Sequence, residues 1–179
     1  GKESENFWID MDMIPFGQLL MMSPRQELFR EGDARAVRLA GNGNRRWPQF
    51  SHDQMFTFIT LRALAASPLM VGGDLPTMDR FSLRLLTDPD MLACNQNGVM
   101  GKLVFAEDGI EVWKTPEKNQ SARGWVGVFN RTDRLKTVTL TRAFLGLERE
   151  ATLYDVWKGR KAHTLTAASP IAIDVQPDG

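Results

Sequence analysis

Apolar and polar positions along the chain follow two different patterns, which meet near residue 98. Before that point, stretches with a helical spacing of apolar residues alternate with short apolar runs, which is typical of an α/β fold. After it, short stretches rich in β-branched and aromatic residues are separated by turn residues, which is typical of an all-β fold. The pattern therefore predicts two domains, residues 1–97 and residues 98–179.

A buried helix is predicted for residues 51–66. Ser51 is a favourable N-cap, and Gln54 three residues later completes a capping box. Most of the following positions are apolar, so we expect this helix to be buried on most sides. The apolar run of residues 61–73 is interrupted by Arg62 and by Ser67-Pro68, and the proline ends the helix.

Two short strands and two further helices complete the first half. Residues 7–17 read as a short buried strand that ends in a sharp turn, and residues 69–72 as a fully apolar strand of the parallel type. Asp79 is expected to cap one helix, and Asp88-Pro89 begins another with proline at its first position. Since two strands cannot form a stable parallel sheet alone, we expect this half to be a slice of a larger α/β structure.

About six or seven short strands are predicted after residue 98, and they indicate an antiparallel β-sandwich. The clearest signal is a hairpin whose turn contains Asp108-Gly109. The other strands are expected at residues 125–129, 136–140, 152–157, 164–165 and 171–175.

Charge and composition exclude several classes of function. The 22 Lys and Arg residues balance the 22 Asp and Glu residues, so the chain lacks the basic surface of a nucleic-acid-binding protein. The longest apolar run is too short to span a bilayer, so no membrane partner is expected. Cys94 is the single cysteine, which leaves the redox compartment open, and we expect a buried, inert thiol. His52 and His163 have no Cys or His cluster around them, so no metal or cofactor is expected.

The candidate chemistry lies in residues 8–13, Trp-Ile-Asp-Met-Asp-Met. In a strand, residues two apart point to the same side, so Asp10 and Asp12 are expected to share one face. Acids at a strand end are costly to bury unless they are paired or functional, and barrel enzymes place their chemistry there. On spacing alone, one capping and one solvated aspartate also explain the pattern. Functional acids would fit glycoside hydrolysis, or a metal-dependent sugar transferase that usually needs a glycine-rich turn absent here.

An ordered series of motifs resembles glycoside hydrolase family 27, the α-galactosidases and α-N-acetylgalactosaminidases. Residues 8–13 with Gly17 are similar to the W-x-D-x-D-M motif of that family. Residues 51–75 resemble its last barrel helix and strand, and residues 125–131 and 155–157 resemble strands of its C-terminal domain. The resemblance implies an α/β part, the last two βα units of a (β/α)8 barrel, followed by an all-β part, an antiparallel β-sandwich.

The resemblance also implies a function and site residues. Asp12 and Met13 match positions that line the sugar pocket, and Trp8 and Asp10 match positions that support Asp12. The implied partner is a carbohydrate with a terminal α-galactosyl-type sugar, cleaved with retention through a covalent intermediate. In the family the nucleophile and the acid/base aspartate lie on earlier strands, so no catalytic residue is assigned within this chain. We therefore expect the chain alone to be inactive.

Other interpretations stay open at the level of the sequence. The sandwich alone can be a carbohydrate-binding or structural module, with the first half as a partly ordered flank. Exposed edges of the barrel strands then favour a homo-oligomer. Residues 20–48 form a longer loop than in the animal enzymes of the family, which leaves the exact sugar open. A periplasmic or extracellular location is compatible with the resemblance but is not fixed by it.

Overall fold

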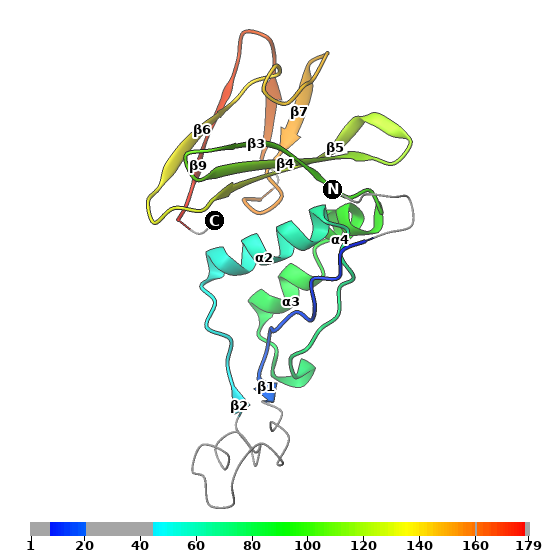
Figure 1. The fold of residues 1–179 in the computed structure, drawn as a ribbon, viewed down its shortest axis with the longest axis vertical. Coiled ribbons are helices and arrows are strands. Elements are labelled where there is room, and N and C mark those ends of the chain that lie inside the picture. Colours follow the sequence, from blue (N-terminus) through cyan, green and yellow to red (C-terminus); the bar gives the residue numbers. More distant parts are fainter. Residues whose placement is uncertain (1–7, 21–44, 160, 178–179) are drawn as a thin grey trace, which may run out of the picture. The chain divides into compact units, whose positions relative to one another are not determined.

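The computed structural model describes residues 8–20, 45–159 and 161–177 (Figure 1). The chain divides into two compact units, each made of separate segments. The first unit contains residues 1–11, 51–68 and 87–179, and the second contains residues 12–50 and 69–86. Most of the long loop predicted for residues 20–48 lies outside the described residues. The predicted domain boundary at residues 97 and 98 stays a prediction.

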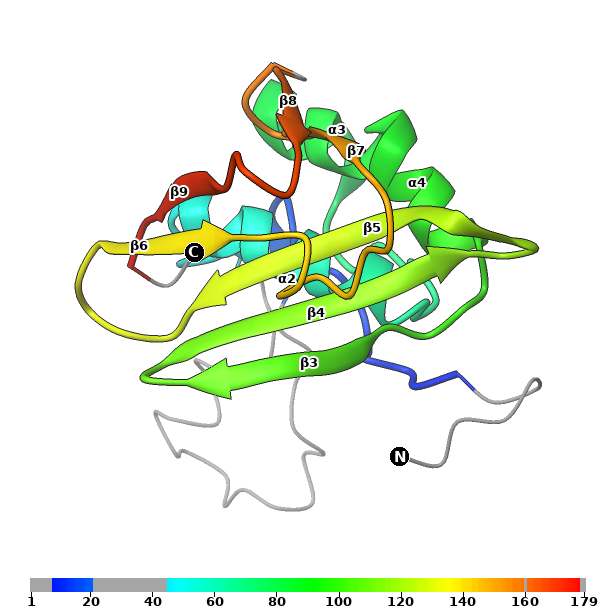
Figure 2. The same cartoon turned by 90° about the horizontal axis from the view of Figure 1, so that it is seen from above.

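A three-stranded antiparallel sheet forms the centre of the first unit. Strand β3 (Lys102–Glu107) pairs with β4 (Ile110–Glu117), which pairs with β5 (Gln120–Asn130) (Figure 2). Asp108 and Gly109 between β3 and β4 both have positive φ, which suits a tight two-residue hairpin. The predicted hairpin is therefore confirmed.

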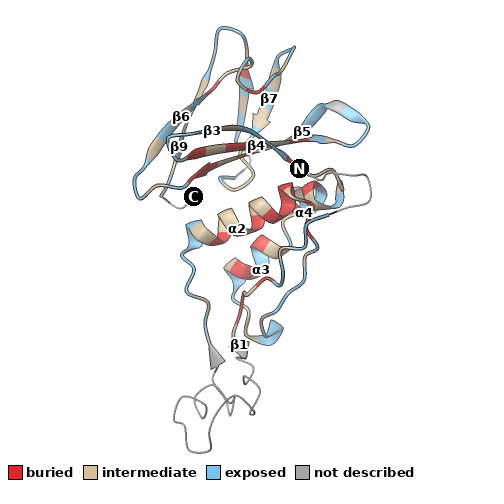
Figure 3. Ribbon diagram, in the orientation of Figure 1, coloured by how far each residue is buried: buried red, intermediate tan, exposed pale blue. Residues whose placement is uncertain are grey.

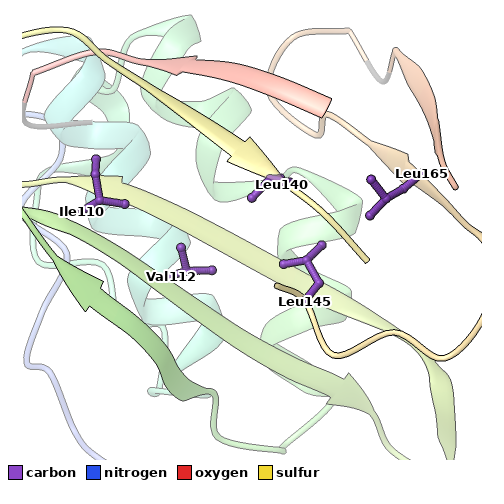
Figure 4. Close-up of a cluster of buried hydrophobic side chains, with 5 residues drawn as sticks. All are labelled: Ile110, Val112, Leu140, Leu145 and Leu165. Carbon is purple, nitrogen blue, oxygen red and sulfur yellow. The ribbon is translucent and has the colours of Figure 1, made fainter. Parts of the chain in front are cut away.

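Two further antiparallel strand pairs lie over one face of this sheet (Figures 1 and 2). Strand β6 (Lys136–Leu140) pairs with β9 (Ile171–Val175), and β7 (Ala151–Tyr154) pairs with β8 (Ala162–Leu165). The layers enclose a cluster of buried aliphatic side chains (Figure 4): Ile110, Val112, Leu140, Leu145 and Leu165. The antiparallel β architecture predicted for this half of the chain is confirmed.

Helix α2 (His52–Leu64) packs against the opposite face of the central sheet. Its predicted capping box is present: Ser51 Oγ accepts a hydrogen bond from the Gln54 N–H at 3.1 Å, and Gln54 Oε1 accepts one from the Ser51 N–H at 3.1 Å. At the other end of α2, the Leu64 side chain lies over Gly127 of β5, where an added Cβ would meet Leu64 Cδ1 at 2.5 Å. Figure 3 shows the buried residues along α2 and β4.

Helix α4 (Pro89–Gln96) follows α2 in the first unit and begins as predicted. Asp88 Oδ1 accepts hydrogen bonds from the N–H groups of Asp90 and Met91 at 3.0 and 3.1 Å. None of the described helices combines the length and the apolar character needed to cross a membrane.

The second unit contains a short antiparallel pair, β1 (Leu19–Leu20) and β2 (Arg45–Arg46), which the sequence pattern does not predict. A 3-10 helix, η2 (Leu75–Thr77), and helix α3 (Arg80–Leu86) follow. Asp79 Oδ1 accepts a hydrogen bond from the Ser82 N–H at 2.7 Å, so Asp79 caps α3 as expected.

The two strands predicted for the first half are not regular strands. Residues 8–13 form no strand, and the segments that follow meet residues 71–74 only through two isolated bridges among the described residues, a parallel one between Ile14 and Val71 and an antiparallel one between Gln18 and Asp74. The cause lies in the backbone of Asp12, whose φ of 65° takes the chain out of the extended conformation. Trp8 and Ile9 are exposed, so this segment is not buried either. The barrel units stay a proposal.

Candidate functional site

Residues 12–18 of the second unit lie beside residues 70–74. The Ile14 N–H donates to the Met70 carbonyl at 2.7 Å, and the Gly72 N–H donates to the Ile14 carbonyl at 2.9 Å. The Ile14 side chain is fully buried. This pairing gives the segment that carries the candidate residues a fixed neighbour and a fixed register.

Two consecutive glycines allow this close approach. A Cβ at Gly73 would lie 1.5 Å from the Phe16 carbonyl oxygen, and one at Gly72 would lie 2.8 Å from Met13 Cβ. No other residue fits these positions without moving one of the two segments. The Gly-Gly pair therefore places the Met13 side chain directly over the backbone of Gly72.

Asp12 has an unusual backbone conformation for a residue other than glycine. Its φ of 65° lies in the left-handed region, and its Oδ1 accepts a hydrogen bond from the Met13 N–H at 2.6 Å. Such a local bond lets aspartate adopt this conformation at lower cost than most residues. Strained backbones of this kind cost roughly 1–3 kcal/mol and cluster at functional sites. Asp12 and Met13 are both exposed, Met13 by 55%.

The expectation that Asp10 and Asp12 share one face is wrong. It requires an extended strand, and the left-handed φ at Asp12 interrupts the two-residue alternation. Asp10 belongs to the first unit and Asp12 to the second, and both are exposed. Because both carboxylates are exposed, neither carries the free-energy cost of burial on which the prediction was based.

Trp8 is fixed within the first unit by its indole nitrogen. Its Nε1 donates a hydrogen bond to the Gly98 carbonyl at 3.0 Å, just after helix α4. The structure therefore brings Asp12 and Met13 together, whereas the indole N–H of Trp8 is directed to Gly98.

The main chain of Met11 is held by two buried side chains. Its N–H donates to Ser67 Oγ at 3.0 Å, and its carbonyl accepts a hydrogen bond from Arg62 Nη2. Ser67 is 0% and Arg62 3% exposed. The Arg62 guanidinium also lies 4.2 Å from the ring centroid of Phe58, one helical turn earlier on α2. Asn95 of α4 continues the network, since its Nδ2 donates to the Ser67 carbonyl at 2.7 Å.

Sequence reasoning assigned no role to Arg62 or Ser67. It registered them only as polar interruptions of an apolar run. An arginine inside an otherwise apolar helix is the signal that points to such a role, because arginine is almost never fully buried without a partner.

The remaining candidates have structural explanations. Burial raises the pKa of the Cys94 thiol to about 12, so this thiol is inert, as expected. Asp155 Oδ1 accepts hydrogen bonds from the N–H groups of Trp157 and Lys158, which fixes the turn after β7. Within the described ranges, no three His, Cys, Asp or Glu side chains gather where they could hold a metal ion.

Asn130 begins an Asn-Arg-Thr tripeptide that fits the N-glycosylation pattern. Its side chain is 1% exposed, and its Nδ2 donates to the carbonyls of Arg134 and Val175 at 2.6 and 3.1 Å. The amide is therefore a buried link between β5 and the end of β9, and it is not available for modification in the folded chain.

Comparison with known proteins gives a consistent set of relatives. Residues 107–179 match the family model of the α-galactosidase C-terminal β-sandwich domain. An α-galactosidase of Oryza sativa subsp. japonica is 32% identical over 142 residues, which cover 76% of this chain and 31% of that protein. An α-galactosidase of Cyamopsis tetragonoloba is 32% identical over 122 residues, which cover 66% of this chain and 28% of that protein. The chain thus spans about a third of the length of these curated relatives.

Solved structures extend the likeness beyond the sandwich. A protein of Bacillus halodurans C-125, described provisionally as an α-N-acetylgalactosaminidase, superposes with a TM-score of 0.77 at 29% identity. The match covers 96% of this chain and 37% of that protein. A family 27 β-L-arabinopyranosidase of Geobacillus stearothermophilus superposes with a TM-score of 0.75 at 27% identity, covering 96% of this chain and 35% of that one.

Proposed function

Because the chain belongs to the α-galactosidase family, glycoside hydrolase family 27, we propose that it supplies one wall of a sugar pocket in a retaining glycoside hydrolase. Residues 1–97 are then the last two βα units of a (β/α)8 barrel, and residues 98–179 are the β-sandwich that follows it. The substrate class is a glycoside with a terminal α-galactosyl-type sugar.

The observation that carries this proposal is the backbone of Asp12. A left-handed φ is retained at a cost in stability, and a functional constraint explains why an aspartate rather than a glycine occupies the position. The Asp12 carboxylate and the Met13 side chain are then the groups that contact the sugar. Carboxylates accept hydrogen bonds from hydroxyl groups, and these charge-assisted bonds are the strong ones.

The two reacting carboxylates of the mechanism lie, in this proposal, on polypeptide outside the chain. A retaining site needs two carboxyl groups about 5–5.5 Å apart that flank the scissile bond. Asp10 and Asp12 are two residues apart on one segment, and they cannot attack the anomeric carbon and protonate the leaving oxygen from opposite sides. Asp12 therefore binds and orients the sugar, and Asp10 and Trp8 support the segment that carries it.

The relatives narrow the part of the sugar that this wall contacts. Two of the solved neighbours are described as an α-N-acetylgalactosaminidase and a β-L-arabinopyranosidase, and the relatives found by sequence as α-galactosidases. The rings of α-D-galactose and β-L-arabinopyranose share their configuration at carbons 1 to 4. A wall common to these pockets therefore contacts ring hydroxyls, and the substituents at carbons 2 and 5 are distinguished elsewhere.

A titration of the chain labelled with ¹³C at the methionine methyl groups tests the proposal. D-galactose should shift the Met13 methyl signal, with a dissociation constant on the order of 1–10 mM because one wall supplies few of the contacts. The C4 epimer D-glucose should shift it much less, and the buried Met55 and Met91 methyls should not move. Asp12→Ala should abolish the response.

Equal responses to both sugars, or an unchanged response in Asp12→Ala, would contradict the proposal. A second outcome identifies the alternative function. If galactose moves the indole N–H signals of Trp113 and Trp125 while Met13 stays unchanged, the sandwich is a carbohydrate-binding module and the pocket wall is wrongly assigned.

A further inference from the structure

We propose that Arg62 and Ser67 are positioning residues for Asp12. They hold the main chain of Met11 at both of its hydrogen-bonding groups, and this keeps the next residue in the left-handed conformation. The inference rests on the proposed function, in which Asp12 and Met13 contact the sugar.

Both polar groups of the Met11 peptide backbone are bound by side chains rather than by a neighbouring strand. The N–H reaches Ser67 Oγ at 3.0 Å, and the carbonyl receives Arg62 Nη2. A strand partner would hold several residues in a row and would impose extended dihedrals on all of them. Two side-chain bonds to one residue fix that residue alone, so the chain is free to turn immediately afterwards.

The two bonds come from a rigid source. Arg62 lies in the last turn of α2, and the Ser67 N–H donates to the Arg62 carbonyl at 3.1 Å. Asn95 of α4 donates to the Ser67 carbonyl at 2.7 Å and so ties the second helix to the same point. Helices hold functional side chains more accurately than loops do. The position of the Met11 main chain is therefore fixed relative to helices α2 and α4 of the first unit.

The burial of Arg62 indicates that its guanidinium has a specific role. Arg62 is 3% exposed, and removing a guanidinium from water is costly unless its hydrogen bonds and charge are satisfied. An aliphatic side chain at this position would meet the packing needs of α2 without that cost. We infer that arginine occupies this position because its guanidinium binds the Met11 carbonyl. The face of the Phe58 ring stabilises the positive charge.

The residue that these side chains hold, Met11, directly precedes the strained residue Asp12. Asp12 has φ 65°, and strained conformations persist only where the surroundings determine them. The bond from the Met13 N–H to Asp12 Oδ1 acts on the C-terminal side, and the Met11 clamp acts on the N-terminal side. With Met11 released, Asp12 is expected to relax toward the β or right-handed region, which moves its carboxylate and the Met13 side chain together.

NMR of the full 179-residue chain tests this with Ser67→Ala and Arg62→Met. The one-bond Cα–Hα coupling and the intraresidue HN–Hα NOE of Asp12 report the sign of φ. Both variants should lose the left-handed signature, and in Ser67→Ala the Met11 amide should exchange about tenfold faster. Signals of the β3–β4 hairpin should stay unchanged, which shows that the fold is retained. Ser82→Ala, which alters a buried serine of α3, is the matched control.

The sugar response separates positioning from simple stabilisation. In both variants the galactose-induced shift of the Met13 methyl should fall at least about fivefold, and Arg62→Lys, which restores a donor, should recover part of it. A left-handed Asp12 in both variants overturns the inference, and so does an undiminished sugar response. If the unaltered chain shows no galactose response while the variants lose the signature, the clamp stands and the proposed function fails.

Discussion

Asp12 has a left-handed backbone conformation that glycine adopts more readily than aspartate does. The sequence motif identifies the aspartate as a candidate, but no local pattern predicts its φ of 65°. That angle depends on Met11 being held by Arg62 and Ser67, which lie more than fifty residues away along the chain. The candidate residues could therefore be read from the sequence, whereas the clamp that places them could not.

Asp12→Gly is expected to change the stability little, because glycine adopts a left-handed φ without strain and this gain offsets the lost bond to the Met13 N–H. Asp12→Ala should lower the free energy of unfolding by about 1 kcal/mol, because it keeps the strain and loses the bond to the Met13 N–H. Urea unfolding monitored by tryptophan fluorescence measures both. A clearly destabilised Asp12→Gly would mean that the carboxylate has a structural role and not a functional one.

The Cys94 thiol should be unreactive in the folded chain. Burial raises its pKa to about 12, so at pH 8 only about one thiol in 10⁴ is ionised, and the side chain is also inaccessible. Iodoacetamide at pH 8 should leave Cys94 unmodified over an hour and should alkylate it fully in 8 M urea. Rapid alkylation of the native protein, read by mass spectrometry, would show that helix α4 opens locally.

Among the elements, helices and hairpins could be predicted, whereas the pairing of the short apolar segments in the first half of the chain could not. The caps at Ser51, Asp79 and Asp88 are local signals, and all three form as expected. The strand expected at residues 7–17 depends on partners distant in sequence. Among the described residues, Ile14 forms an isolated parallel β-bridge with Val71. The apolar residues of this segment therefore do not form a continuous strand.

The β4–β5 pair carries an acid that should make stability depend on pH. Hydrogen bonds from Arg131 and Trp113 hold the pKa of Glu111 below its ordinary value. Since the folded pKa is lowered, the stabilisation is fully present above the unfolded pKa of about 4.3 and is lost as pH falls through the lower folded value. Glu111→Gln should therefore be less stable than the unaltered chain at pH 7, with the difference shrinking toward pH 3. A difference that stays constant between pH 7 and pH 3 in urea titrations would exclude this contribution.

At the scale of the whole molecule, the apolar side chains at the Ile14–Val71 bridge need an explanation. Met13, Met70 and Val71 are 55%, 45% and 37% exposed. Monomeric proteins rarely leave such groups together on an edge that can pair with further strands. The proposed function supplies the explanation, because the preceding strands of a (β/α)8 barrel would cover them.

When that cover is absent, the same edge should drive self-association. Sedimentation velocity of the 179-residue chain should show oligomers that grow between about 5 and 100 µM, and Val71→Lys should shift the distribution to monomer, since a charged edge blocks pairing. Leu135→Lys, at an exposed apolar position of the first unit, is the control and should change nothing. If the chain stays monomeric over the whole concentration range, the edge at Val71 is not an association surface.

In the proposed function, Asp12 contacts the sugar, and the two carboxylates that break the glycosidic bond lie outside residues 1–179. The most direct measurement is the release of nitrophenol from an aryl α-D-galactoside, by the 179-residue chain and by the chain extended with the in-frame coding sequence before residue 1. We expect no release above a buffer blank by the chain, and hydrolysis by the extended protein whose kcat/KM falls about 10²–10³-fold in Asp12→Ala. Turnover by the 179-residue chain that Asp12→Ala abolishes, or an extended enzyme indifferent to that substitution, would contradict it.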